Sequence, residues 1–283
     1  MTTKETFNMI LAQQQKWADN NKIELRGENN TTVYSKYLAD NLFCTKLSLK
    51  TLGEFLSGQG DELKSHMRAL YSSSALLVNV FEYWRRVQRV VDIAVACGAS
   101  QGMTDMVFEK KHKIANLGTP HLDIEFTGES EIPFAVEAKF TEPYQVNVTQ
   151  RNDTNLDKYL AKEVLWQGIS KCKVLAKVIF EEEGKKTSYK YLDTPQLIKH
   201  ILGLSYRYKS NGFTLLYLWW DCSTNASKGL NDDIQRFSNA IKDEISFKSM
   251  TYQELFYNIR NIPGADKSYT DYLGERYFTS ESQ

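Results

Sequence analysis

The feature that most constrains the fold is a pair of short segments in which apolar and charged residues alternate. The segments 121–126 and 133–140 are separated by the turn-forming sequence 127–130, Thr-Gly-Glu-Ser. Alternation with a period of two predicts β-strands with one apolar and one polar face, and the short turn favours an antiparallel pair. The charged residues on the polar faces are Asp123, Glu125, Glu137 and Lys139.

The rest of the chain surrounds this pair with helical patterns. A short strand is predicted at 106–111, and a strongly apolar strand at 214–220. Helical spacing over 68–95 predicts one long helix or two shorter ones, followed by a break at Gly98. Further helices are expected at about 154–179, 192–209, 228–244 and 251–260, with a short run near 246–247. A three-strand meander followed by a helix and another strand implies a mixed sheet with helices on its faces.

The composition is that of a folded protein with one or two domains. The chain has 283 residues, of which 42% are hydrophobic, and 35 basic residues balance 35 acidic ones. A net charge of zero disfavours nucleic-acid binding by overall charge, although a local basic surface remains compatible with it. The four cysteines form no C-x-x-C pair, which disfavours a cysteine zinc site and favours reduced thiols. No secretory signal and no membrane-length apolar run is visible, so we expect a cytoplasmic protein without membrane contact.

The polar face of the strand pair has the chemistry of a divalent-metal site. If the strands pair across their turn, Asp123, Glu137 and Lys139 lie close together on one side of the sheet. Two carboxylates can hold Mg²⁺, with Mn²⁺ as a substitute, and a nearby ammonium can stabilise charge that builds up on a phosphate. This set is suited to hydrolysing a phosphodiester. A solvated polar face with an ordinary ion pair is the alternative interpretation.

These residues also resemble a known motif. The segment 120–123 (PHLD), followed by 136–139 (VEAK), is similar to the motif of the PD-(D/E)xK nuclease superfamily, and the order of elements resembles its αβββαβ core. Two residues separate Pro120 from Asp123, so the literal Pro-Asp dipeptide is absent. More narrowly, the segment 72–81 (SSSALLVNVF) resembles a Ser-Ser-x-Ala…Asn-x-Phe helix found in a group of bacterial restriction endonucleases.

The resemblance implies a fold, an activity and residue roles. The fold is α/β with a restriction-endonuclease-like core at 65–283, in which helices flank a central mixed sheet, and a helical N-terminal extension occupies 1–64. The implied activity is Mg²⁺-dependent cleavage of DNA, in a restriction or phage-defence system. Asp123 and Glu137 would be metal ligands, and Lys139 would be the water-orienting base or the charge stabiliser.

Other candidate residues carry weaker signals. Glu82 lies three residues after Asn79 on the helix before the meander, where many members of the superfamily have an acidic residue. Gln167 lies on the helix predicted after the motif, where related nucleases often have a polar residue. A solvated surface position is the alternative for both. Of the four histidines, only His121 is expected to line the cleft. The candidates for contacts with DNA phosphates are Lys110, Lys111, Lys113, Arg85, Arg86 and Lys171.

Two other functions remain open at this point. The chain could be a nuclease-like binding or assembly module that does not cut, or a structure-selective nuclease that acts on branched DNA or RNA. Divalent-metal affinity separates the first alternative from an active enzyme, and cleavage assays on matched substrates separate the second. Cutting both strands of a duplex with one site per chain often uses two copies, so a homodimer is a further expectation.

Overall fold

A central sheet is the organising feature of the computed structural model, which describes residues 1–28, 32–58, 62–145, 155–182 and 188–278. The strands of this sheet are β3 (Asp105–Lys111), β4 (His121–Thr127), β5 (Phe134–Lys139), β6 (Thr214–Trp219) and β7 (Ser246–Thr251). A separate hairpin consists of β1 (Leu25–Glu28) and β2 (Thr32–Ser35).

Ten α-helices lie in the described part of the chain. They are α1 (Thr3–Asn20), α2 (Leu49–Leu56), α3 (Ser73–Arg86), α4 (Val90–Ala96), α5 (Asp157–Leu160), α6 (Ser170–Glu181), α7 (Thr194–Tyr208), α8 (Asn225–Ile241), α9 (Tyr252–Arg260) and α10 (Lys267–Tyr277). Short 3-10 helices are η1 (Leu38–Asn41), η2 (His66–Arg68), η3 (Glu142–Tyr144) and η4 (Glu163–Trp166). Among the described residues, no helix has both the length and the apolar character needed to cross a membrane.

The sheet has the mixed topology that the element order predicts. Its strand order is β3-β4-β5-β6-β7, with antiparallel pairing from β3 to β5 and parallel pairing from β5 to β7. The connection from β5 to β6 contains α5, α6 and α7, and the connection from β6 to β7 contains α8, because parallel neighbours need a long crossover. The predicted restriction-endonuclease-like αβββαβ core is therefore confirmed.

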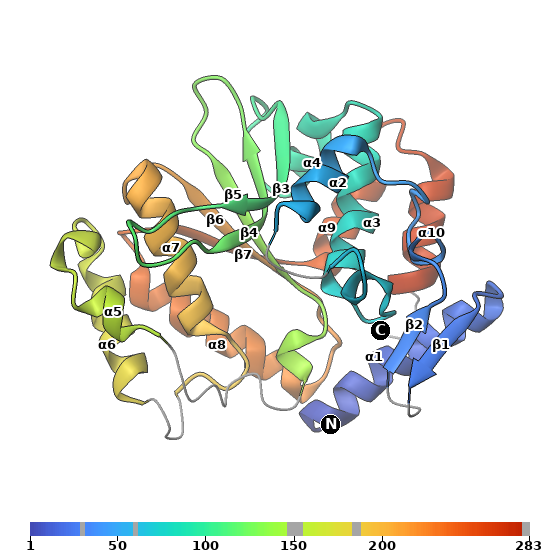
Figure 1. Ribbon diagram of the computed structural model, residues 1–283, viewed down its shortest axis with the longest axis horizontal. Helices are drawn as coiled ribbons and strands as arrows, with labels where there is room; N and C mark the ends of the chain where they lie inside the picture. The colour runs from blue at the N-terminus through green and yellow to red at the C-terminus, as the bar shows by residue number, and fades with distance from the viewer. Residues whose placement is uncertain (29–31, 59–61, 146–154, 183–187, 279–283) are drawn as a thin grey trace.

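Helices cover both faces of the sheet. Figure 1 shows α5, α6, α7 and α8 on one side, and α2, α3, α4, α9 and α10 on the other. The apolar strand residues face the second group, where Phe81 of α3 packs against Phe126 of β4 with 6.2 Å between ring centroids. The polar strand residues face α7, which contacts Glu137 through His200 and Glu125 through Tyr208. This crossover helix therefore shields part of the charged face of the meander from solvent.

Two parts of the chain differ from the sequence-based expectation. The N-terminal region contains the β1–β2 hairpin as well as helices, and α10 was not predicted. The single helix expected over 154–179 is replaced, within its described part, by α5, η4 and α6. Gly168 separates the last two: its φ of 77° lies in the left-handed region that a continuing helix does not use.

Candidate functional site

The site begins where β4 and β5 stop pairing. The ladder between them covers only three pairs, from Phe126–Phe134 to Ile124–Val136. Beyond it, the Oδ2 atom of Asp123 accepts a hydrogen bond of 2.6 Å from the backbone N–H of Ala138. A side-chain carboxylate thus satisfies a donor that a continued ladder would have used.

Asp123, Glu137 and Lys139, here called the acid–lysine cluster, interact closely at this opening. The Nζ atom of Lys139 lies 2.7 Å from Oε1 of Glu137, and both side chains are largely buried. Burial lowers the pKa of Lys139 because it disfavours the charged ammonium. The negative charges of Glu137, Glu142 and Asp123 outweigh this effect and raise the pKa well above its usual value. Lys139 therefore stays positively charged.

The two acids of the acid–lysine cluster titrate differently. Burial and the nearby charges of Glu137 and Glu109 raise the pKa of Asp123 well above its usual value. Burial also raises the pKa of Glu137, but the electrostatic effects of Lys139 and His200 are larger and lower that pKa to about 2. Two neighbouring carboxylates resist simultaneous ionisation, so Glu137 holds most of the negative charge of the pair when no cation is bound.

His200 is a member of this site that the sequence did not reveal. It lies on α7, is 2% exposed, and its Nε2 atom is 3.0 Å from Oε2 of Glu137. Neither atom meets the geometric criteria for a hydrogen bond with any partner among the described residues. We therefore describe a close polar contact. No spacing in the sequence links His200 to the strands, so only the packing of α7 could identify it.

Glu109 is a second member that was not predicted. The register of β3 and β4 sets it opposite Asp123, and its φ of 51° is unfavourable for a glutamate within a strand. Its Oε2 atom is 3.5 Å from Nδ1 of His121. Burial and the charges of Glu62 and Glu137 raise the pKa of Glu109 to about 7.

Glu109→Gln is expected to stabilise the metal-free protein at pH 8 and to have little effect at pH 4. The pKa of Glu109 rises from 4.5 to about 7 on folding, so the native state binds the proton more tightly and stability falls as pH rises through this window. At pH 8 the gain in unfolding free energy should be about 1–3 kcal/mol. Urea unfolding at both pH values measures it, with the exposed Glu129→Gln as control. An equal effect at both pH values would contradict the prediction.

The serines at the start of α3 tie that helix to the surroundings of the site. The hydroxyl of Ser73 donates a hydrogen bond of 2.5 Å to Glu142, and that of Ser74 donates one of 2.7 Å to Glu62. Glu142 contributes to the raised pKa of Lys139. Ser73, the second serine of the Ser-Ser-x-Ala resemblance, therefore holds an acidic side chain that acts on Lys139.

Glu82 is not brought to the acid–lysine cluster by any contact among the described residues. It is fully buried, and its oxygens accept hydrogen bonds of 2.7 Å from the backbone N–H of Ser48 and 2.5 Å from the hydroxyl of Thr51. Both partners lie at the beginning of α2, so Glu82 anchors that helix on α3.

Gln167 is not on a helix, contrary to the prediction. It is an exposed residue at the C-terminal end of η4, directly before the left-handed Gly168. The described residues provide no contact between Gln167 and the acid–lysine cluster. The helix that reaches the cluster after the motif is α7, and its polar residue there is His200.

The predicted basic residues fall into two groups. Lys110, Lys111 and Lys113 follow Glu109 at the end of β3 and in the loop beyond it, and Lys110 Nζ is 3.6 Å from Glu125. Lys111 donates a hydrogen bond to the backbone carbonyl of Ser57. Lys111 and Lys113 are exposed, so this group lies beside the site.

The other basic residues have structural partners elsewhere. Arg85 is largely buried and contacts Glu54 at 2.7 Å and the backbone carbonyl of Met106, which fixes α2 over the free edge of β3. Arg86 donates to the carbonyl of Lys46 on the surface. Lys171 pairs with Asp243 at 2.9 Å at the start of α6.

The chemistry of the donors fits a hard divalent cation. Glu137 Oε2 is buried without a hydrogen-bond partner among the described residues, and the negative charges of Glu137 and Glu109 contribute to the raised pKa of Asp123. No group of three or more His, Cys, Asp or Glu side chains within the described ranges is arranged to enclose a metal ion. Two carboxylates supplemented by water or substrate oxygens are the usual environment of Mg²⁺, whereas structural zinc needs four protein ligands.

One of three comparisons with known proteins identifies a family for this chain. A family model described as Restriction Endonuclease associating with ARP matches residues 11–278. No curated protein and no solved structure matches the chain. The match extends over nearly all of the sequence, from within α1 to the residue after α10. The chain therefore belongs to the family of restriction endonucleases associating with ARP.

Proposed function

We propose that this protein is a metal-dependent endonuclease of the PD-(D/E)xK type that hydrolyses DNA phosphodiester bonds, with the acid–lysine cluster as its active site. The observation that carries the proposal is the opening of the β4–β5 ladder beside Asp123, Glu137 and Lys139. Membership of a restriction-endonuclease family supports DNA as the substrate and a role in restriction or phage defence.

Asp123 and Glu137 would hold Mg²⁺, for which Mn²⁺ could substitute. When bound, the ion would lower the pKa of a coordinated water and neutralise charge on the phosphate. Glu137 is already ionised, and a bound cation would oppose the effects that raise the pKa of Asp123 and favour its charged form. These two side chains therefore supply the negative charge that a divalent ion requires.

Lys139 would act as a cation and not as a proton acceptor. Its neighbours raise its pKa well above the usual value, so an unprotonated amine is scarce at neutral pH. A protonated lysine can donate hydrogen bonds to a water or to a phosphate oxygen, and it stabilises charge that develops during the reaction. Of the two roles that the motif implies for Lys139, water-orienting base or charge stabiliser, the raised pKa favours charge stabilisation.

Lys110, Lys111 and Lys113 are proposed contacts for DNA phosphates. They extend from the strand that carries Glu109, next to the acid–lysine cluster. Phosphate contacts of this kind position a duplex without reading its sequence. Each phosphate that these lysines neutralise releases counterions, so DNA binding by this group should weaken as the salt concentration rises.

The test is cleavage of supercoiled plasmid and phage DNA with Mg²⁺, with Mn²⁺ or with EDTA. Asp123→Asn keeps an oxygen that can accept the Ala138 N–H and removes the charge. We expect metal-dependent cutting by the wild type, and loss of at least about 100-fold in this variant. The exposed Asp105→Asn serves as a matched control and should cut normally.

The outcomes also separate the alternative functions. Cutting that persists in EDTA or in Asp123→Asn would overturn the assigned site. Metal binding without cleavage of duplex, branched or single-stranded DNA or RNA would identify a non-catalytic binding module. Preferential cutting of branched DNA or RNA would identify a structure-selective nuclease.

A further inference from the structure

Two buried histidines contact two buried glutamates on the same face of the sheet. His200 lies 3.0 Å from Glu137, and His112 lies 2.9 Å from Glu125. All four residues are 1–2% exposed. In both pairs the two atoms in contact are within hydrogen-bond distance without hydrogen-bond geometry. Burying an imidazole without a formed hydrogen bond is unfavourable, so each pair calls for an explanation.

The pairs differ in what surrounds the glutamate. Glu125 accepts a hydrogen bond of 3.2 Å from Tyr208 and has Lys110 at 3.6 Å. Glu137 has Lys139 at 2.7 Å on its other oxygen and acts electrostatically on Asp123. Only the His200–Glu137 pair therefore includes a member of the acid–lysine cluster. The His112–Glu125 pair provides a matched comparison within the same protein.

His200 approaches Glu137 from a different layer of the fold. Lys139 is two residues along the same strand and holds Oε1, whereas His200 lies in the middle of α7 and is closest to Oε2. Its neighbours on the buried side of α7 are apolar, including Leu197, Ile201 and Leu204. A ring fixed by such packing has little freedom, so it can restrict the carboxylate that it touches.

We propose that His200 is a positioning residue that fixes the orientation of the Glu137 carboxylate and thereby sets the affinity of the site for a divalent cation. A glutamate side chain has several rotatable bonds, and contacts to both oxygens limit its orientations before a ligand arrives. Side chains that are already oriented lose less conformational entropy when they bind a metal ion. Residues that contact and orient metal ligands therefore affect metal affinity strongly. The inference rests on the proposed function in so far as Glu137 binds a metal.

The experiment measures binding of Mn²⁺ and Ca²⁺ to the full-length protein by isothermal titration calorimetry, without DNA. His200→Leu fills the space with an apolar side chain, and His200→Gln returns a polar group near the position of Nε2. We expect His200→Leu to weaken Mn²⁺ binding roughly 10- to 100-fold and His200→Gln to restore most of it. The control His112→Leu, which removes the matched histidine, should leave Mn²⁺ affinity unchanged.

A second readout separates positioning from a general structural effect. The Mn²⁺ concentration for half-maximal cleavage should rise in His200→Leu, whereas the cleavage rate at saturating Mn²⁺ should fall much less. Circular dichroism and thermal unfolding verify that all variants are folded.

Each unfavourable outcome has its own meaning. Unchanged Mn²⁺ affinity in His200→Leu, or an equal loss in His112→Leu, would overturn the inference. Equal losses in His200→Leu and His200→Gln would also overturn it, because a polar contact with Glu137 would then not account for the affinity. If the wild type binds no Mn²⁺, the proposed metal dependence fails, and this result is distinct from the others.

Discussion

Replacing Lys139 by methionine is expected to lower the rate of DNA cleavage roughly 10³- to 10⁴-fold at saturating Mg²⁺. Methionine fills a similar volume but removes the positive charge that lies 2.7 Å from Glu137. The lost contributions are charge stabilisation on the phosphate and orientation of the attacking water. Single-turnover cleavage of a plasmid, with protein in excess over DNA, measures the rate without interference from product release.

The matched variant for this prediction is Lys139→Arg, which keeps the charge but changes its geometry. We expect Lys139→Arg to retain part of the activity. Without metal, Lys139→Met should also melt at a lower temperature, because Glu137 loses the partner that offsets its burial. Wild-type cleavage rates in a folded Lys139→Met protein would rule out the acid–lysine cluster as the active site.

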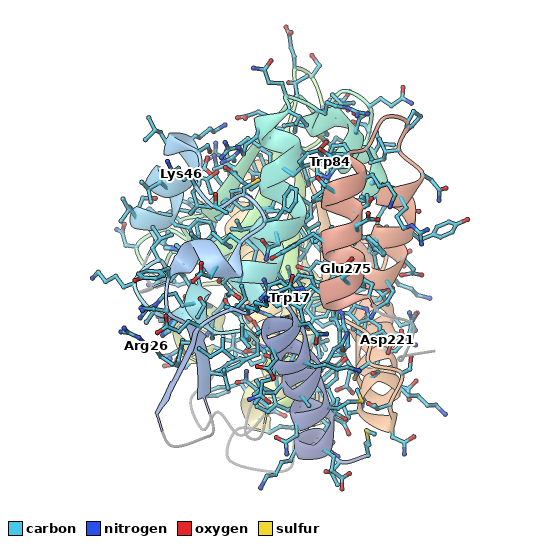
Figure 2. All side chains as sticks on the ribbon, turned by 90° about the vertical axis from the view of Figure 1, so that its right-hand side faces the viewer. Trp17, Arg26, Lys46, Trp84, Asp221 and Glu275 are labelled. Carbon is cyan, nitrogen blue, oxygen red and sulfur yellow. The ribbon has the colours of Figure 1, made fainter. Side chains whose placement is uncertain are left out.

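Replacing Arg276 by alanine is expected to lower the free energy of unfolding by about 3–5 kcal/mol. Arg276 on α10 is fully buried and donates hydrogen bonds to Gln14 of α1, to Tyr272 and to two oxygens of Asn41. Its guanidinium also lies 4.2 Å from the centroid of the Trp17 ring. Figure 2 shows α1 meeting α10 where Trp17 and Glu275 are labelled.

Urea unfolding followed by tryptophan fluorescence measures this change in the free energy of unfolding, because the five tryptophans of the chain report on global unfolding. Arg276→Lys keeps the charge but lacks the planar set of donors, so it should destabilise the protein by a smaller amount. A loss below about 1 kcal/mol in Arg276→Ala would contradict the prediction. The same contacts bear on the boundary predicted at residue 64. A fragment covering 65–283 would lack Gln14, Asn41 and Trp17, and we expect it to unfold more readily than the full chain.

The alternating pattern of the two strands determined much of the site in advance. Side chains that alternate along a strand must face opposite sides, so Asp123, Glu137 and Lys139 could be assigned to one face without a structure. The antiparallel meander followed from its short turn, and the parallel strand β6 followed from the helical pattern before it. These are local properties of the backbone, and local sequence is sufficient to predict them.

Only the tertiary structure decided what surrounds those three residues. His200 is 61 positions away from Lys139 along the chain, and its contact with Glu137 depends on which face α7 covers and on how that helix is rotated. The left-handed backbone of Glu109 has no glycine or other sequence signal to reveal it. Arg85 resembles a surface cation in the sequence, yet its donors are engaged by Glu54 and the Met106 carbonyl. Periodicity predicts the direction of a side chain relative to its own element, whereas its partners depend on how separate elements pack, which is a property of the whole fold.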